Sequence, residues 1–99
     1  MQFEWDRKKN TLNIKKHGID FSDGEELFSG AWPLLVAADL DNDLAEERWR
    51  GIGCIQGRVV VAVFTEPKAD VIRFISLRKA NQEERQAYEE AIRDELESS

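Results

Sequence analysis

The sequence predicts an α+β domain with a mostly antiparallel sheet of about four strands, two helices near the amino terminus and one helix at the carboxyl terminus. Three observations lead to this interpretation. A charged stretch of helix length lies between a capping residue and a glycine at residues 6–18. A nearly continuous run of β-branched residues at 58–65 is typical of a central strand covered on both faces. Apolar residues at 87–96 recur at the spacing of one helix face.

Length and composition limit the chain to one domain. With 99 residues, 41% of them hydrophobic, it can bury one modest core, so we expect a single domain over residues 1–99. Early charged residues exclude a signal peptide, and the longest apolar run, residues 59–64, is far shorter than the roughly 20 residues of a membrane span. We therefore expect a soluble cytoplasmic protein. Cys54 is the single cysteine, which excludes an internal disulfide, and nothing in the sequence points to a metal or other cofactor.

The first elements are a short strand and a basic helix. Residues 2–5 are long enough only for a short strand, and Asp6 follows in the position of a helix N-cap. The helix is expected to end at about His17, because Gly18 permits a left-handed exit. Lys16 and His17 lie in its last turn, where positive charge is favourable.

A second short helix is expected to begin at Ser22, which has capping-box spacing with Glu25, and to stop at Gly30. Four further segments have strand-like composition: residues 33–38, 46–55, 58–65 and 71–77. Asn81 and Glu84 then open the final helix.

Turn residues separate these strands. Residues 39–43 contain three aspartates and are expected to form an exposed turn or loop. Gln56-Gly57 has the composition of a tight hairpin turn, and Pro67 and Asp70 bracket the next turn.

The charges are segregated along the chain. The net charge of −6 argues against general affinity for nucleic acids, because a negative protein repels a polyanion. However, residues 1–18 and 51–80 each carry +3, whereas residues 19–50 carry −7 and residues 81–99 carry −5. Solvated surfaces account for most of the acidic charge, but the segregation predicts a basic face beside acidic flanks.

Several motifs occur in a distinctive order and spacing. The positions concerned are Phe3, Glu4, Trp5, Asp6, Asn13, Lys16, His17, Gly18, Phe21, Glu47, Arg48, Ile52, Gly53, Gly57, Arg58, Ile72, Arg73, Ile75, Ser76, Arg78, Ala80 and Tyr88. In these positions the chain resembles the BrnT family of small bacterial ribonuclease toxins, which share a RelE-like fold. It departs from the family pattern at residues 65–68, where relatives continue the strand into an arginine-containing turn.

Members of that family cleave RNA as growth-arresting toxins of type II toxin–antitoxin systems. The resemblance implies a RelE-like fold, an RNA substrate and a cognate BrnA-like antitoxin with a ribbon-helix-helix domain. Contact with DNA would occur only through that antitoxin. The interpretation we favour is therefore a metal-independent endoribonuclease toxin. The alternatives are a catalytically weak RelE-like protein that docks an antitoxin-like partner, and a stand-alone structural domain.

Metal-free RNA cleavage needs a base for the 2'-hydroxyl proton, cationic donors for the phosphate and an acid for the departing 5'-oxygen. Arginine suits the second role because its planar fork meets two phosphate oxygens and keeps its charge. The candidates for phosphate or transition-state binding are Arg48, Arg58, Arg73 and Arg78, with Lys16 and Lys79 as RNA-binding helpers. Arg58 adjoins a turn glycine, which favours a structural role, so Arg48, Arg73 and Arg78 are the residues we expect to bind phosphate.

Each of these arginines also has a structural interpretation as a solvated or ion-paired residue. Arg73 lies in an apolar strand, where an unpaired buried charge costs several kcal/mol. Regular alternation places Arg73 and Arg78 on opposite faces, so they converge only if the strand ends or bulges before Arg78.

His17 is the only side chain whose ordinary pKa lies near neutrality, which makes it the candidate proton carrier. Its place at a helix end equally suits a capping role. Tyr88 lies in the apolar stripe of the last helix, where core packing is the default, but the resemblance keeps it as a candidate RNA contact. Glu47 is either a base or a solvated strand residue.

Overall fold

Five strands and three helices make up the part of the chain that the structure, a computed structural model, describes: residues 1–40 and 47–97. In chain order they are β1 (Gln2–Trp5), α1 (Arg7–His17), the 3₁₀ helix η1 (Phe21–Phe28), β2 (Leu35–Ala38), β3 (Trp49–Ile55), β4 (Arg58–Lys68), β5 (Val71–Lys79) and α2 (Gln82–Glu97). Residues 41–43 of the predicted loop, and Glu46 at the predicted start of a strand, lie outside the described residues. No helix in the described ranges is long and apolar enough to span a membrane.

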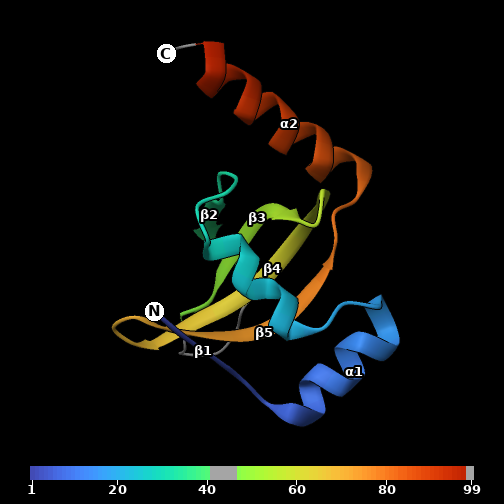
Figure 1. Cartoon of the computed structure of the whole chain (residues 1–99), viewed down its shortest axis with the longest axis vertical. Helices are drawn as coiled ribbons and strands as arrows, with labels where there is room; N and C mark the ends of the chain where they lie inside the picture. The colour runs from blue at the N-terminus through green and yellow to red at the C-terminus, as the bar shows by residue number, and fades with distance from the viewer. Residues whose placement is uncertain (41–46, 98–99) are drawn as a thin grey trace.

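All five strands join one mixed sheet in the order β1-β5-β4-β3-β2 (Figure 1). Strands β2 to β5 pair in antiparallel fashion, whereas β1 pairs in parallel with β5. The α+β class is confirmed. The predicted RelE-like arrangement, with about four strands and two amino-terminal helices, was wrong in detail. The short strand expected at residues 2–5 joins the sheet as a fifth member, β1, and the second helix is of the 3₁₀ type.

Capping and turn residues in the sequence predicted the ends of several helices and strands correctly. The Asp6 carboxylate caps α1 by accepting a hydrogen bond from the Lys9 N–H at 3.0 Å, and Gly18 leaves the helix with φ 72°. Gln56 and Gly57 both have positive φ (51° and 79°), as a tight hairpin turn of type I′ requires.

Helix η1 starts differently from the prediction. Its N-cap is Asp20, whose carboxylate accepts a hydrogen bond from the Ser22 N–H at 2.9 Å, so Ser22 lies inside the helix. The helix ends at Phe28, two residues before the expected stop at Gly30. Asp20 caps the helix in place of Ser22 because an aspartate carboxylate can accept a hydrogen bond from the backbone N–H two residues ahead, as in an Asx turn.

One face of the sheet, called the core face, packs beneath η1. Its buried cluster consists of Phe21, Leu27, Ile55, Val60, Ala62, Phe64, Ile72, Phe74 and Leu77. The contact is close at Gly53, where an added Cβ would lie 2.8 Å from Leu27 Cδ2 and 3.1 Å from Leu34 Cδ1. Glycine there allows the helix to approach the sheet.

The opposite side of the sheet, called the second face, is covered at one end by α2. Tyr88 is 1% exposed there, and its hydroxyl donates a hydrogen bond to the Pro33 carbonyl at 2.5 Å. Asn81 and Glu84, which were predicted to open this helix, form a capping box: Asn81 Oδ1 accepts a hydrogen bond from the Glu84 N–H, and Glu84 Oε1 accepts one from the Asn81 N–H, both at 2.8 Å. Figure 1 shows α2 continuing beyond the sheet, so much of the second face lies outside the cover of this helix.

Candidate functional site

A β-bulge in β5 places Arg73 and Arg78 on the same face of the sheet. Phe74 on β5 pairs with Phe64 on β4, and Ser76 pairs with the adjacent residue, Val63. Ile75, between Phe74 and Ser76, is therefore an extra residue on β5. The extra residue reverses the alternation. Arg73, Ser76 and Arg78 therefore belong to the second face, which meets the condition that the sequence analysis set for bringing the two arginines to one side.

Two more arginines belong to this face. Arg50 on β3 lies opposite Val63, the partner of Ser76 on β4. Arg48 lies just before β3, and its carbonyl accepts a hydrogen bond from the Asp39 N–H at 2.9 Å. Because this backbone pairing continues that of β2 with β3, alternation places Arg48 on the side of Arg50. The arginine face is defined as Arg48, Arg50, Arg73 and Arg78. The sequence analysis missed Arg50, although its two-residue spacing from Arg48 was a signal that could have identified it.

Glu4 holds the Arg73 guanidinium in position. Arg73 Nε donates to Glu4 Oε2 at 2.6 Å, and Arg73 Nη2 lies 2.5 Å from the same oxygen. The pair follows from the parallel register that sets Glu4 beside Arg73. Both side chains are about half exposed, so the pair orders the arginine more than it stabilises the fold. Within the described residues, nothing bonds Arg73 Nη1.

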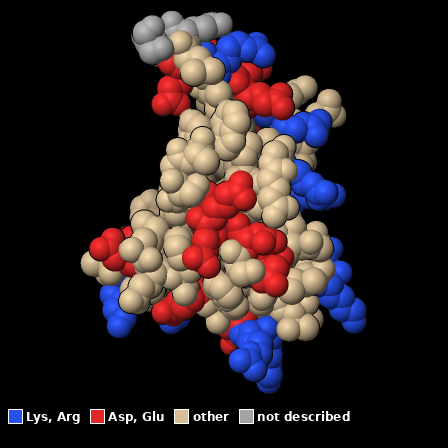
Figure 2. Space-filling model, in the orientation of Figure 1, with Lys and Arg blue, Asp and Glu red and all other residues tan. Residues whose placement is uncertain are grey.

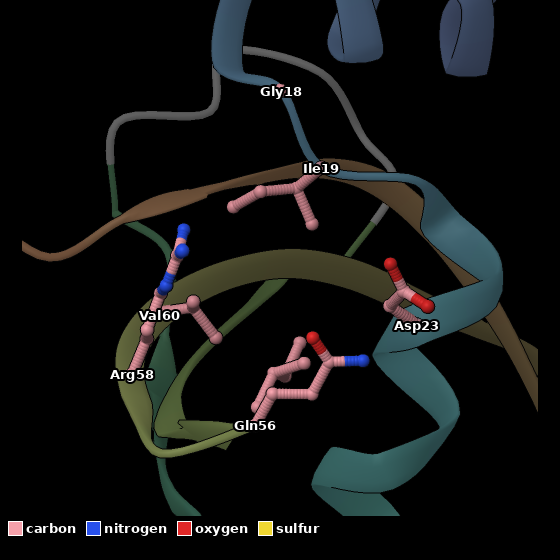
Figure 3. A pocket seen from close by; sticks show the side chains of 7 residues that line it. Gly18, Ile19, Asp23, Gln56, Arg58 and Val60 are labelled. Carbon is pink, nitrogen blue, oxygen red and sulfur yellow. The ribbon is translucent and has the colours of Figure 1, made fainter.

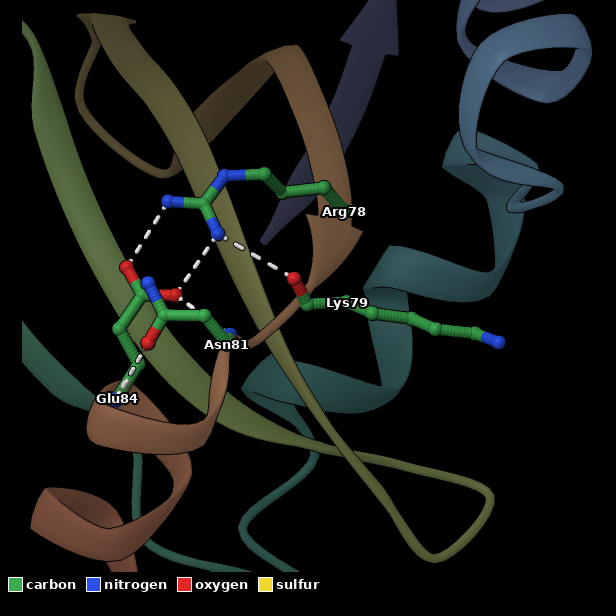
Figure 4. Close-up of polar contacts among 4 residues, drawn as sticks. All are labelled: Arg78, Lys79, Asn81 and Glu84. Atoms are coloured by element: carbon green, nitrogen blue, oxygen red, sulfur yellow. Dashed lines mark hydrogen bonds and ion pairs between the residues drawn. The ribbon is translucent and has the colours of Figure 1, made fainter.

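Arg78 forms a two-pronged ion pair with Glu84 (Figure 4). Its Nη1 and Nη2 donate to the two Glu84 carboxylate oxygens at 2.8 and 2.9 Å, and Nη1 also donates to the Lys79 carbonyl at 3.2 Å. The pKa of Glu84 is lowered to about 2, chiefly by the hydrogen bonds from Arg78, with smaller contributions from the Asn81 N–H and the charges of Arg78 and Arg50. Arg78 thus ties the end of β5 to the start of α2.

The arginine face is too long for all its members to bind one phosphate. Arg73 lies opposite Thr65 and Arg78 opposite Val61, which are four residues apart on β4. At about 3.3 Å per residue, this separation is about 13 Å. The face therefore offers two groups of donors, one around Arg73 and one around Arg78.

His17 and Lys16 lie at the edge of the sheet beside the second group. Together with Ser76 they line an open pocket of ≈ 290 Å³ between α1 and β5. Partial burial lowers the pKa of His17 below its ordinary value of 6.5, and the charges of Lys16 and Arg78 lower it further. This shift favours the neutral form of His17 at pH 7, which is the form that accepts a proton.

Lys79 and Tyr88 do not join the arginine face. Lys79 points away from the Arg78–Glu84 pair in Figure 4 and lines a separate pocket with Arg58 and Arg85. Burial raises the pKa of the Tyr88 hydroxyl, which is already bonded to the Pro33 carbonyl. The structure thus places Tyr88 in the packing of α2, not at the surface.

Other surface features have a different character. A pocket of ≈ 230 Å³ beside the β3–β4 hairpin has Arg58 and Asp23 on opposite sides (Figure 3). Figure 2 shows acidic side chains gathered over η1, on the side of the molecule that carries the core face. The acidic residues of this helix and its cap are Asp20, Asp23, Glu25 and Glu26. Across the described ranges, no three His, Cys, Asp or Glu side chains are grouped so as to bind a metal ion.

Comparison with known proteins identifies a matching family and a similar solved structure. The family model described as "Ribonuclease toxin, BrnT, of type II toxin-antitoxin system" matches residues 5–84. The 1.1 Å crystal structure of the Brucella abortus ribonuclease toxin BrnT superposes with a TM-score of 0.61 at 29% sequence identity, covering 83% of this chain and 99% of the Brucella chain. No curated protein sequence matches the chain.

Proposed function

Because the chain belongs to the BrnT family of ribonuclease toxins of type II toxin–antitoxin systems, we propose that it cleaves RNA on its arginine face without a metal ion and arrests growth when its antitoxin is absent. The observation that carries this proposal is the bulge at Ile75, which gathers Arg73 and Arg78 with Arg48 and Arg50 on one face. Glu4, Asp39 and Glu84 each pair with one of these four guanidinium groups, so the local charge is lower than four but is still positive, in contrast to the net charge of −6 of the chain.

The proposed roles follow from position. Neutral His17 takes the proton from a ribose 2'-hydroxyl, and the resulting oxygen bonds to the neighbouring phosphorus to give a 2',3'-cyclic phosphate. The bond from phosphorus to the 5'-oxygen breaks, and this oxygen takes its proton from water. Arg48, Arg73 and Arg78 bind phosphates and stabilise the charge that develops on the transferring group. Lys16 beside His17 and the more distant Lys79 extend the contact to flanking nucleotides.

The proposed partners are RNA and a cognate antitoxin. A BrnA-like ribbon-helix-helix protein would inhibit the toxin in the cytoplasm and would alone contact operator DNA. The basic arginine face would attract acidic side chains of such a protein as well as RNA.

Induced expression with analysis of total RNA tests the proposal. The wild type should arrest growth and leave RNA fragments, and Arg73→Ala should do neither, with cleavage reduced at least about 100-fold as expected for loss of a transition-state donor. Arg93→Ala, an exposed arginine of α2 away from the arginine face, is the matched control and should behave as wild type.

Purified protein tests metal independence, since cleavage should persist in EDTA. Folded wild-type protein that leaves RNA intact would instead support the catalytically weak binding protein. Equal loss of activity in Arg73→Ala and Arg93→Ala would contradict a specific role for the arginine face.

A further inference from the structure

A pocket at one end of the sheet is lined by three cationic side chains. Arg58 begins β4, Lys79 ends β5 and Arg85 lies near the start of α2, and the pocket that they line has a volume of ≈ 290 Å³. Among the described residues that line it, Glu89 carries the one carboxylate. This pocket is more enclosed than the open pocket beside His17, so a ligand would be surrounded on several sides.

The strand register brings two of these cations to one place. Lys79 pairs with Val60, and Arg58 lies two residues before Val60 on the same face of β4. The Ala80 N–H continues this pairing by donating to the Val59 carbonyl at 3.0 Å, which sets the segment leading into α2 beside the start of β4. Helix α2 supplies the third cation, so three separate segments of the chain provide the positive charges.

These three cations are exposed and have no carboxylate partner. Within the described residues, no ion pair or side-chain hydrogen bond involves the charged groups of Arg58, Lys79 or Arg85. On the arginine face, by contrast, three of the four guanidinium groups are each paired with a carboxylate. Three cations and one carboxylate leave this pocket with about two uncompensated positive charges.

The charge of the pocket favours a phosphate monoester over an anion with a single charge. A monoester carries a charge of about −1.5 to −2 at pH 7, which matches the uncompensated charge of the pocket. A carboxylate, like a phosphodiester inside an RNA chain, carries only one negative charge and would leave the pocket positive. An internal phosphodiester also needs room for the chain on both sides, whereas this pocket is partly enclosed. Both properties favour the end of a nucleic-acid chain over its middle.

We propose that Arg58, Lys79 and Arg85 bind the terminal 5'-phosphate of an RNA. The site rests on the proposed ribonuclease function, which supplies RNA as the ligand, and it adds a preference among RNA chains. Cleavage by the proposed mechanism leaves a 5'-hydroxyl on the downstream fragment, because the bond from phosphorus to the 5'-oxygen breaks. The pocket therefore retains RNA that carries a 5'-phosphate but does not retain the downstream product.

A matched pair of RNAs tests this assignment. Two 2'-O-methylated 12-mers of the same sequence, each with a fluorophore at the 3' end, differ only in carrying a 5'-phosphate or a 5'-hydroxyl, and neither can be cleaved. The wild type should bind the 5'-phosphorylated RNA at least about 5-fold more tightly, as expected from several exposed ion pairs. The ratio of the two affinities isolates the pocket, because contacts with the arginine face are the same for both RNAs.

Substitutions in the pocket should change this ratio in opposite directions. Arg58→Gln, Lys79→Gln and Arg85→Gln should each lower the ratio, and they should fold like the wild type because the three side chains are exposed. Glu89→Gln should raise the ratio, because it removes a carboxylate that repels the phosphate. Arg93→Gln is the matched control: it removes the same charge from a part of α2 outside the pocket and should leave the ratio unchanged.

The failure of the pocket can be told apart from the failure of the proposed function. Because neither 12-mer is cleaved, a preference for the 5'-phosphate would support the pocket even if the wild type left natural RNA intact, which would sink only the ribonuclease. Equal affinity of the wild type for the two RNAs, including no measurable binding of either, would overturn the pocket. So would a ratio that falls as much in Arg93→Gln as in Arg85→Gln.

Two further arms identify other occupants. AMP in excess should compete with the 5'-phosphorylated RNA and lower its affinity to that of the 5'-hydroxyl RNA. If AMP binds in the pocket but the two RNAs bind equally, a free nucleotide replaces the RNA end as the ligand and the assignment is overturned. If the three cation variants lose binding of a polyglutamate peptide while the RNA ratio stays unchanged, the pocket belongs to an acidic protein and the assignment is also overturned.

Discussion

The side chain of Asn13 forms hydrogen bonds with both backbone groups of Leu77. Asn13 Nδ2 donates to the Leu77 carbonyl at 2.8 Å, and Asn13 Oδ1 accepts from the Leu77 N–H at 3.0 Å. Strand β1 pairs with β5 only as far as Phe74. Beyond that point the side-chain amide of Asn13 makes the two hydrogen bonds that a residue of a neighbouring strand would make. Because Asn13 is the buried residue of α1, this contact positions Lys16 and His17 at the sheet edge.

Replacement of Asn13 by alanine should lower the free energy of unfolding by about 3 kcal/mol, because the Leu77 N–H and C=O become buried without partners. Urea denaturation measures the change. Asn10→Ala is the control: Asn10 also bonds two groups near η1, but it is only half-buried, so about 1 kcal/mol is expected. Similar losses in the two variants would contradict the strand-like role of Asn13.

Glu84 should make stability sensitive to acid. Its pKa is lowered from 4.5 to about 2 in the folded chain, chiefly by hydrogen bonds from Arg78, so its contribution is fully present above about pH 4.5. That contribution is lost as the pH falls from about 4.5 to about 2. Glu84→Gln should therefore show a shallower decline of stability over this interval, measured by urea unfolding at successive pH values. An unchanged slope would mean that the pair does not form in solution.

The single histidine allows a direct titration of His17 by NMR. Its pKa should lie below 6.5, because burial and the charges of Lys16 and Arg78 oppose protonation. Lys16→Ala should raise this pKa, whereas replacement of the more distant Lys8 by alanine should leave it in place. A wild-type pKa above 6.5 would contradict the described surroundings of the ring.

If neutral His17 is the base, RNA cleavage should rise with pH through the pKa of this group and then level off. His17→Gln should lose most activity and this pH dependence together. The folded protein should also lose stability below about pH 6.5, since the unfolded chain then binds the proton more readily than the folded one.

Replacement of Tyr88 by phenylalanine should show whether the hydroxyl serves in the packing of α2 or in contact with RNA. The change removes the hydrogen bond to the Pro33 carbonyl and should cost about 1 kcal/mol of stability, or somewhat more if that carbonyl stays dry. RNA cleavage measured well below the melting temperature should be unaffected, because the hydroxyl is buried. A selective loss of cleavage in a stable Tyr88→Phe protein would restore the sequence-based hypothesis of an RNA contact.

Features encoded by neighbouring residues could be predicted from the sequence. The Asp6 cap, the Gly18 exit, the Gln56-Gly57 turn and the Asn81–Glu84 capping box each depend on contacts within four residues. Such contacts leave a signature in residue type and spacing.

Features that depend on distant pairing could not be predicted in this way. The bulge at Ile75 carries no glycine or proline to mark it, and it decides whether Arg73 and Arg78 share a face. The side on which Arg48 and Arg50 lie likewise depends on the register between β3 and β4. The sequence analysis could therefore propose arginines as ligands but not their grouping.

The parallel pairing of β1 with β5 has a consequence for biosynthesis. Strand β1 is synthesised first, but its pairing partner β5 is the last strand of the chain. Glu4 therefore cannot bind Arg73 until almost the entire polypeptide has been made. A truncated product ending before Val71 would lack two of the four guanidinium groups and the hydrogen bonds that dock α1. Under the proposed function, prematurely terminated translation would thus release a fragment with an incomplete arginine face, and only completed chains would need an inhibitor.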